Sequence, residues 1–389
     1  MSSKSLVVTA GVLFAGLALF FLVLPGAIER WFNHTVHPGP YAASESAREV
    51  HRRLLVADLH ADSLLWGRDL LVRGTRGQVD VPRLIEGNVG LQVFSVFSKI
   101  PRGLNIERND DCTDLVPLLA LSQGWAPKTL TSLKERAVYQ ARRLFRMASL
   151  SKGRLVVVKT HADLASYLER RRHEPEAGIT AGLLSLEGAQ VLEGDLANVD
   201  AMDKAGYRMV GLTHFFDNEL GGSAHGVAKG GLTPFGREAV RRLEQRRILV
   251  DLAHASPRTI EDVLAMAARP VVVSHTGVRG TCDNTRNLSD EQIQAVARGG
   301  GVVGIGYWPT AVCGDDAAAI ARSVRHAARV AGIDHVGIGT DFDGAVTVPF
   351  DATGHVLVTE ALLQEGFSED EVSRIMGGNV LRLLAETLP

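Results

Sequence analysis

The chain has 389 residues, of which 46% are hydrophobic and 22% are charged, so it carries ample apolar material for a globular core. Its formal net charge of -2 lacks the basic excess typical of nucleic-acid-binding domains, and no nucleic-acid partner is expected. Three cysteines are too few for a disulfide scaffold, and their spacings fit no zinc knuckle. In an exported protein they allow one bridge and one free thiol, and composition does not say which pair is bridged.

The first 28 residues differ from the rest of the chain. No charge occurs between Lys4 and Glu29, and the run LVVTAGVLFAGLALFFLVLPGAI is almost wholly apolar. About 20 such residues match the ~30 Å hydrocarbon core of a bilayer, so residues 1–28 are predicted to form a transmembrane anchor. A cleaved signal segment stays open as the alternative. Because Lys4 precedes the run, we expect a cytoplasmic N-terminus and an exported remainder, on the periplasmic or extracellular side.

Eight short apolar runs follow a linker and a lead-in helix at residues 29–50, and they alternate with segments of helical period. Runs that are apolar on both faces are typical of parallel strands covered by helices. This alternation predicts a single (β/α)8 TIM barrel over residues 51–389, with an insertion at about 101–178 that holds at least one extra helix. The predicted strands are Leu54–His60, Gly90–Ser98, Ala181–Glu187, Met209–His214, Ile248–His254, Pro270–His275, Gly301–Tyr307 and His335–Asp341.

Six of the eight predicted strands end in a side chain that can ionise or bind a metal. The C-terminal ends of the strands build the active site on one rim of such a barrel. Four of the 13 histidines fall at these ends, which makes a chance arrangement a poor explanation. The strand-end residues are His60, Asp62, Glu187, His214, His254, His275 and Asp341, with Asp343 close behind.

These residue types suit zinc or a similar divalent ion, and thiolate ligands are nearly absent from the chain. A site with two metals about 3.5–4 Å apart needs a bridging carboxylate and a shared water or hydroxide. His60, Asp62, Glu187, His254 and His275 are enough for such a site, with Glu187 as the natural bridge. The remaining pair, His214 and Asp341, would then be free to act on a substrate.

Six motifs, in order, make the chain after residue 50 resemble the membrane (renal) dipeptidases, peptidase family M19, which are zinc peptidases among the amidohydrolase-like barrels. The motifs are DLHAD, SLEG, GLTHFFDN, DLAHAS, SHTGVRGTCDNTRN and GIGTDFDG. The resemblance implies hydrolysis of dipeptides by a hydroxide that bridges two zinc ions per chain. Acceptance of a D-residue at the C-terminal position is a family trait that this sequence does not itself show.

The resemblance also implies which residues hold each metal. His60 and Asp62 are similar to the ligands of the first zinc, and Glu187 is similar to the bridge. His254 and His275 are similar to the ligands of the second zinc. This division agrees with the ligand set expected from the strand ends alone.

Further roles follow from the same resemblance. His214 resembles the histidine that polarises the scissile carbonyl, and Arg286, with Asn287 beside it, resembles the arginine that binds the terminal carboxylate of the substrate. Asp341 resembles the aspartate that handles protons at the leaving amine. Spacing alone does not decide between Asp341 and Asp343; the strand-end position favours Asp341.

Three features depart from the family pattern. Animal members have a C-terminal lipid anchor, whereas this chain ends in LRLLAETLP, so its N-terminal segment is expected to anchor it. Cys282 and Cys313 lie close to positions that are bridged in the animal enzymes, which makes them the disulfide candidates and leaves Cys112 without an evident partner. Tyr307 is a candidate for the family's substrate-facing tyrosine, although the loop after it does not align cleanly.

Two other functions stay open. An N-acyl-amino acid amidase of the same barrel superfamily would keep the metals and would still use Arg286 for a carboxylate. A non-catalytic anchored binding protein is expected to have lost a ligand, and none is missing here. The expected partners are a small dipeptide substrate and the membrane, and a homodimer is left open.

Overall fold

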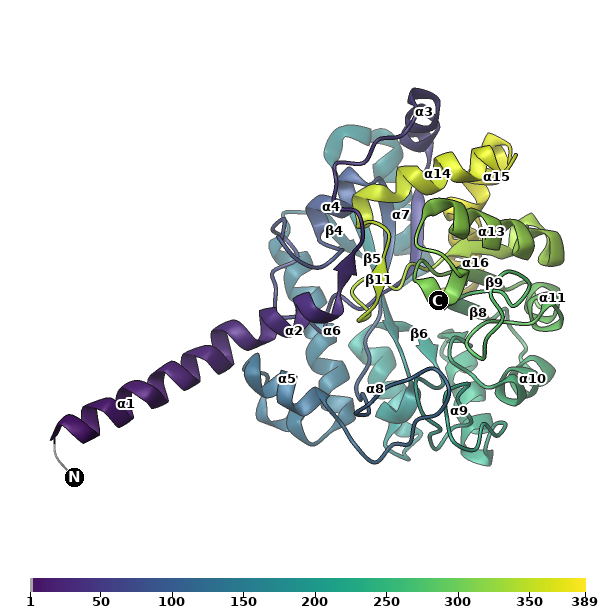
Figure 1. The fold of residues 1–389 in the computed structure, drawn as a ribbon. Helices are drawn as coiled ribbons and strands as arrows, with labels where there is room; N and C mark the ends of the chain where they lie inside the picture. Colours follow the sequence, from purple (N-terminus) through teal and green to yellow (C-terminus); the bar gives the residue numbers. More distant parts are fainter. Residues whose placement is uncertain (1–2) are drawn as a thin grey trace.

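Eight strands that bury both faces close into a parallel barrel in the computed structural model, which describes residues 3–389 (Figure 1). Strand β2 pairs with β3, the order continues through β5, β6, β7, β8 and β9 to β10, and β10 pairs with β2 to close the ring. All eight predicted strands are confirmed. Their bounds are β2 Val56–Ala61, β3 Val89–Phe94, β5 Thr180–Leu186, β6 Tyr207–Gly211, β7 Leu249–Asp251, β8 Val272–Thr276, β9 Val302–Ile305 and β10 Val336–Ile338.

Several strands end earlier than the sequence suggests. His254 and Asp341 lie three residues beyond the ends of β7 and β10. Both adopt a left-handed backbone with φ of 62°, which non-glycine residues rarely take and which no strand can contain. Such backbone strain tends to occur at functional sites, where the surrounding structure holds it in place.

Helices cover the outside of the barrel, and side-chain caps set where several begin. Ser256 and Thr233 each accept a hydrogen bond from the backbone N–H three residues later, and Ser289 and Ser368 form full capping boxes. The helices are α3 Glu45–Arg53, α4 Val81–Glu86, α8 Ala197–Ala205, α9 Pro234–Gln245, α10 Pro257–Met266, α11 Asp290–Arg298, α12 Pro309–Val312, α13 Ala317–Ala331, α14 His355–Gln364, α15 Glu369–Ser373 and α16 Asn379–Thr387. Shorter turns are η4 Ala189–Leu192, η5 Ile333–His335, η6 Ala352–Gly354 and η7 Arg374–Gly378.

The segment between β3 and β5 contains the predicted extra helix, α6 (Leu133–Leu150), and further elements. A three-residue strand, β4 (Leu155–Val157), pairs with the first residues of β5, while β6 pairs with its last residues. β4 lies within the predicted insertion at about 101–178 and is not among the eight predicted strands. The other elements here are α5 Val116–Ser122, η2 Pro127–Leu130, α7 His161–His173 and η3 Pro175–Ala177.

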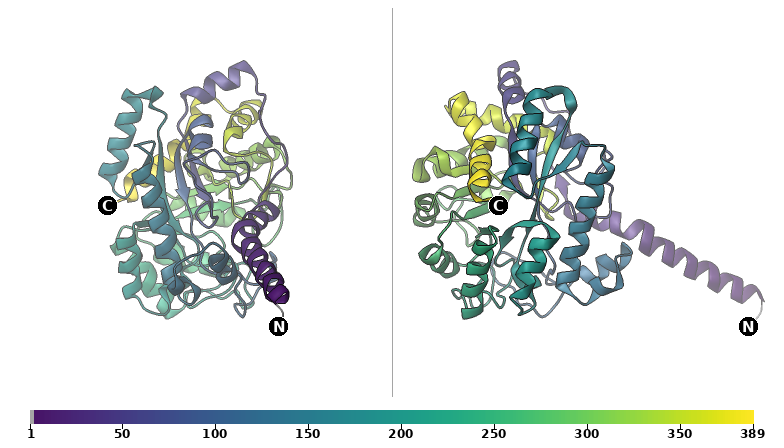
Figure 2. Two further views of the ribbon diagram at one scale, coloured as in Figure 1. Left: turned by 90° about the vertical axis from the view of Figure 1, so that its left-hand side faces the viewer. Right: turned by 180° about the vertical axis from the view of Figure 1, so that it is seen from behind.

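The N-terminal segment is one long helical rod that projects from the barrel (Figures 1 and 2). It is composed of α1 (Ser3–Ala18), a π-helical stretch η1 (Leu19–Val23) and α2 (Leu24–Phe32). The part from Val7 to Phe32 has a mean hydropathy of 2.7 and is long and apolar enough to cross a membrane, and no residue of its most apolar window is buried. A short parallel pairing of β1 (His34–Thr35) with β11 (Thr347–Val348) then leads the chain into α3.

The rod ends at Phe32 rather than at the predicted residue 28, and buried charge explains the difference. Glu29 is buried and pairs with Arg68 and, at 2.6 Å, with Arg76. Arg68 also pairs with Asp343, which follows β10. A buried carboxylate needs such partners, so these ion pairs hold the last turn of the helix against the barrel.

An aromatic cluster inside the barrel wall holds a neutral histidine. His355 is fully buried, with its ring next to those of Tyr307 and Phe342, and its Nδ1 lies 3.3 Å from the hydroxyl of Tyr307. Burial lowers the pKa of His355 to about 3, and the nearby His51 adds to the effect. The imidazole is therefore uncharged in the folded protein at neutral pH.

His355 should make stability depend on pH. The unfolded chain binds a proton at this imidazole below pH 6.5, whereas the folded protein does not until about pH 3. The contribution of His355 to the free energy of unfolding is therefore fully present above pH 6.5 and is lost as the pH falls towards 3. We expect His355→Asn to reduce the loss of unfolding free energy between pH 7 and pH 5 by about 2 kcal/mol. Urea unfolding of the full chain in detergent at both pH values measures this, with exposed His161→Asn as control; an unchanged pH dependence in His355→Asn would contradict it.

Candidate metal centre and active site

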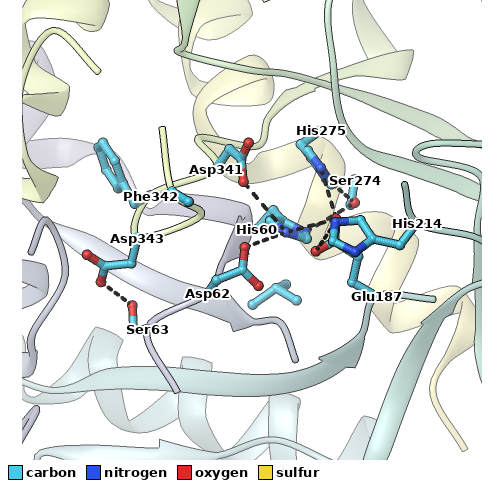
Figure 3. Close-up of polar contacts among 12 residues, drawn as sticks. His60, Asp62, Ser63, Glu187, His214, Ser274, His275, Asp341, Phe342 and Asp343 are labelled. Atoms are coloured by element: carbon cyan, nitrogen blue, oxygen red, sulfur yellow. Dashed lines mark hydrogen bonds and ion pairs between the residues drawn. The ribbon is translucent and has the colours of Figure 1, made fainter. Parts of the chain in front are cut away.

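The cluster of candidate metal ligands begins at the end of β2 (Figure 3). His60 lies inside this strand, and Asp62 is the first residue after it. The two residues are two positions apart in the chain, so their side chains point to the same side. Both side chains are buried, and His60 Nε2 lies 3.4 Å from Asp62 Oδ2. The alternating direction of side chains along the strand therefore brings His60 and Asp62 together as the first pair of candidate ligands.

Glu187 lies at the centre of the site, one residue beyond the end of β5. Its Oε1 lies 3.0 Å from His254 Nε2, 3.3 Å from His275 Nε2 and 3.6 Å from His60 Nε2. Its Oε2 lies 3.4 Å from His214 Nε2. One carboxylate therefore faces imidazole nitrogens that come from four different strands.

The ligand atoms form three overlapping groups, each with all its atoms within 4.8 Å of one another. Glu187 belongs to two of these groups and His60 to two. His254 and His275 fall into different groups, although their Nε2 atoms lie 3.0 Å apart, close enough to share an ion. The groups are His60–Glu187–His275, Glu187–His214–His254 and His60–Asp62–Asp341.

Four buried atoms of the site lack a hydrogen-bond partner among residues 3–389: His60 Nε2, Asp62 Oδ1, His214 Nδ1 and His254 Nδ1. A buried polar atom without a partner costs about 1–3 kcal/mol, so it normally binds water, an ion or a ligand. Imidazole and carboxylate donors without a thiolate are the donor set of a catalytic zinc site. The residues present therefore fit a bound divalent metal.

Burial controls the charge of the histidines. It lowers the pKa values of His214, His254 and His275 well below the ordinary value, and neighbouring positive charges add to the effect. These three imidazoles are neutral at pH 7, which is the form that binds metals. Burial also lowers the pKa of His60, but the charges of Glu187 and Asp62 outweigh it and raise that pKa well above its usual value.

The acidic groups shift in the opposite direction. Burial raises the pKa of Glu187 to about 7, although the charge of His60 opposes the shift. Burial also raises the pKa of Asp341 well above its usual value. Glu187 is therefore poised to exchange a proton near neutral pH unless a cation lies beside it.

A second layer of polar residues, which the sequence analysis does not predict, surrounds the candidate ligands. Ser274 Oγ lies 2.5 Å from Asp251 Oδ2, 2.9 Å from His275 Nδ1 and 3.4 Å from His60 Nδ1. If the hydroxyl donates to Asp251, His275 donates from Nδ1 to Ser274 and keeps the Nε2 lone pair facing Glu187. The sequence signal that could identify Ser274 and Asp251 is their closeness to the histidines: Ser274 precedes His275, and Asp251 lies three residues before His254.

A further buried carboxylate connects two strands beneath the site. Asp58 accepts hydrogen bonds from the hydroxyl of Thr340 at 2.7 Å and from the backbone N–H groups of Thr340 and His60 at 2.9 and 3.2 Å. Asp58 lies two residues before His60 on the same strand face, which is the sequence signal that could have identified it. These bonds fix β2 against β10, just below the ligands.

A cavity of about 140 Å³ opens above the ligand residues. Its polar wall is formed by Asp62, Glu187, His214, His254, Arg286 and Asp341, and its apolar wall by Phe97, Ile100, Leu104, Ile106, Phe215 and Trp308. Three residues that were predicted to act on the substrate, His214, Arg286 and Asp341, line this cavity.

Arg286 is buried at the cavity wall, and no carboxylate among residues 3–389 bonds to it. Its Nη2 donates to His275 O at 2.7 Å and lies 3.3 Å from His254 Nε2. Its guanidinium lies 5.3 Å from the centre of the Trp308 ring, within cation–π range. Burial lowers the pKa of Arg286 to about 10, so the side chain is still positively charged at pH 7.

The structure distinguishes Asp341 from Asp343. Asp341 lines the cavity, and its Oδ1 lies 3.9 Å from His60 Nε2. Asp343 accepts from Ser63 Oγ at 2.6 Å and from the backbone N–H of Gln78 at 2.7 Å, and it also pairs with Arg68. Asp343 is therefore occupied in holding the barrel loops together.

Tyr307 does not reach the cavity, which corrects its predicted position at the substrate. The side chain is fully buried in the aromatic cluster with Phe342, Phe350 and His355. Successive side chains of an extended segment point in opposite directions, so Trp308 lines the cavity instead.

Asn287 also lies outside the cavity wall, and its amide is used within the protein. Its Oδ1 accepts from the N–H of Gly277 at 3.0 Å, and its Nδ2 donates to Cys282 O at 2.6 Å and Ala311 O at 3.0 Å. These bonds shape the loop that carries Arg286. Asn287 is therefore positioned to orient Arg286 rather than to contact a substrate.

A disulfide joins Cys282 and Cys313. The bridge connects the loop after β8, which carries Arg286, to the end of α12 after β9. Cys112 is a free, exposed thiol. The bridge thus constrains two loops next to the cavity.

Comparisons with known proteins agree with this geometry. The family model for membrane dipeptidases (peptidase family M19) matches residues 44–388. Dipeptidase aclJ of Aspergillus oryzae is 28% identical over 359 residues, which cover 87% of this chain and 79% of that protein.

Two solved structures share the fold. A metallo peptidase named dipeptidase AC is 25% identical with a TM-score of 0.70, over 86% of this chain and 99% of its own. A metallo peptidase from Rhodobacter sphaeroides, bound to a phosphinate mimic of L-Ala-D-Ala, is 24% identical with a TM-score of 0.71 over the same shares. The family match covers most of the chain and includes every residue of the metal cluster. The chain therefore belongs to the membrane dipeptidase family, peptidase family M19, and is a metal-dependent dipeptidase.

Proposed function

We propose that the chain is a two-zinc enzyme that cleaves dipeptides, including those with a D-residue at the C-terminal position. The observation that carries the proposal is the position of Glu187, whose two oxygens face imidazoles on both sides. The bound L-Ala-D-Ala mimic in the Rhodobacter sphaeroides relative supports a substrate of this kind.

The metal ligands in this proposal are five buried residues. His60 and Asp62 would hold one zinc, His254 and His275 the other, and Glu187 would bridge them, as its distances to the three histidines allow. Bound zinc would lower the pKa of a shared water towards 7 and polarise the substrate carbonyl.

His214 and Asp341 act on the reacting groups from opposite sides of the site. The neutral imidazole of His214 can donate one N–H to the carbonyl oxygen and stabilise its developing negative charge. Asp341 has a pKa raised by burial, so its carboxyl group can take a proton from the attacking water and pass it to the leaving amine. Both side chains line the cavity and so lie within reach of a bound substrate.

Arg286 sets where the substrate ends. A buried guanidinium on the cavity wall pairs well with the terminal carboxylate of a dipeptide, and the small cavity leaves little room beyond it. An N-acyl-amino acid also carries this carboxylate, so the amidase reading uses the same arginine. The need for a free amine separates the two substrates.

The N-terminal rod is proposed to anchor the enzyme, with the barrel on the periplasmic or extracellular side. Its length and apolar composition support membrane insertion, and Lys4 before it favours a cytoplasmic N-terminus. The disulfide between Cys282 and Cys313 supports the same orientation, because such bonds persist in oxidising compartments.

A substrate screen tests the reaction. We expect the full chain, purified in detergent with zinc, to cleave L,L- and L,D-dipeptides but neither tripeptides nor N-acetylated dipeptides. Arg286→Lys should raise KM by about 10-fold or more, since a bidentate charged pair is lost. Exposed Arg279→Lys, on the same loop, serves as the control. Cleavage of tripeptides as fast as dipeptides would disprove the role of Arg286 in binding the terminal carboxylate. Release of N-acyl groups faster than hydrolysis of free dipeptides would favour the amidase.

Metal content tests the bridge. Purified protein should contain two zinc ions per chain, and Glu187→Gln should retain fewer and lose activity by more than about 100-fold. The amide preserves the size of the side chain but removes the charge that both metals need. Elemental analysis and dipeptide hydrolysis measure the two effects, with exposed Glu261→Gln as the control. Full activity and full zinc content in Glu187→Gln would exclude the bridge.

The support from Ser274 can be tested by zinc affinity. Ser274→Ala should weaken zinc binding by about 10- to 100-fold, because His275 loses the partner that orients it. The matched control is Ser185→Ala, which removes an equally buried hydroxyl that has no hydrogen-bond partner among residues 3–389. Competition with a fluorescent zinc chelator measures both affinities. Equal affinities in the two variants would remove Ser274 from the metal site.

A further inference from the structure

A second hollow, about 410 Å³ in volume, lies beside the active-site cavity. We call it the apolar groove. Its walls are almost entirely hydrophobic and include Ile28, Phe32, Leu65, Trp66, Leu115 and Leu118. Phe97, Ile100, Leu104 and Ala345 line both the apolar groove and the active-site cavity, so the two hollows adjoin.

The apolar groove borders the helical rod. Ile28 and Phe32 belong to α2, and α5, which carries Leu115 at its start and Leu118 within it, packs against both α2 and the π-helical stretch η1 (Figure 1). The stretch η1 lies inside the segment that is apolar enough to cross a membrane. Helix α5 is therefore a neighbour of the proposed anchor and not only of the barrel.

The length of the rod indicates where the apolar groove would lie relative to a bilayer. The segment from Val7 to Phe32 has 26 residues, which gives a helix of about 39 Å, whereas the hydrocarbon core is about 30 Å thick. With the rod inserted as proposed, its end at Ile28 and Phe32 would lie within the interfacial layer of the bilayer. The ion pairs of Glu29 with Arg68 and Arg76 hold this end of the rod against the barrel, so the apolar groove stays beside it.

The surface around the apolar groove is unusually apolar for one in contact with water. Leu118 is 53% exposed, Leu121 46% and Trp31 76%. Contiguous apolar patches of this kind mark contacts with proteins or membranes. Since the patch continues directly into the rod, bilayer lipid is the occupant that the structure favours.

We propose that the apolar groove takes up acyl chains of bilayer lipids, so that the mouth of the active-site cavity opens at the membrane surface. This inference rests on the proposed anchoring by the rod. It adds a lipid contact of the catalytic barrel itself, made by α5 and the adjoining loop. Substrates would then enter from the layer next to the membrane.

Site-directed fluorescence tests the contact. The full chain with Cys112→Ser and Leu118→Cys, labelled with an environment-sensitive dye, is reconstituted into phosphatidylethanolamine and phosphatidylglycerol vesicles containing lipids with a nitroxide on the acyl chain. We expect the nitroxide to quench the label at least about twofold. The matched control carries the label at Gln294→Cys, an exposed position on α11 on the opposite side of the barrel from the rod, and should not be quenched (Figure 1).

The outcomes separate the two proposals. Protein that does not float with the vesicles would overturn the anchor and this inference together. Protein that floats but shows no quenching at position 118, or equal quenching at both positions, would overturn only the lipid contact.

A second measurement addresses the apolar groove itself. Phospholipid with a photoreactive acyl chain should crosslink to peptides that line the apolar groove, and Leu115→Trp, which fills it, should lower the yield at least about threefold. Leu121→Trp, on the exposed side of the same helix and outside the lining, should leave the yield unchanged. Equal yields in the two variants would show that lipid contacts the surface but does not enter the apolar groove.

Discussion

The buried carboxylate of Glu187 is the constraint on which the site depends. A carboxylate removed from water is costly, and its pKa of about 7 reflects that cost. Four imidazoles from different strands surround it, and three of them are held neutral by burial. The closed barrel brings these strand ends within about 4 Å of one group, so closure of the sheet positions the chemistry.

Around this centre the chain uses buried polar bonds to fix geometry. Asp251 and Ser274 orient the imidazoles from below, while Asp58 joins the strands that carry His60 and Asp341. The left-handed backbone at Asp341 turns the chain out of β10 and brings that side chain to the cavity. Ligand atoms in a metal site must be accurate to a few tenths of an ångström, and such rigid support provides that accuracy.

The eight strands and the residues that follow them were predictable because both signals are local: apolar runs, and polar residues at their ends. The direction in which side chains point beyond the end of each strand was not predictable. Tyr307 points into the core and Trp308 into the cavity, and Asp343 is bound by Arg68, because packing between distant segments decides these orientations. The same holds for the helix end at Phe32, which depends on a buried ion pair that no periodicity reveals.

The chain of charges from Glu29 through Arg68 to Asp343 connects the rod to the loop that carries Asp341. A soluble version of the enzyme that begins at residue 30 would leave Arg68 with one carboxylate instead of two and would deprive Arg76 of its partner. The Asp343 side of the network would then take up the unbalanced charge, two residues from a cavity-lining acid. Shortened forms of this protein should therefore retain the final turn of α2, so that removing the apolar rod does not also disturb the active site.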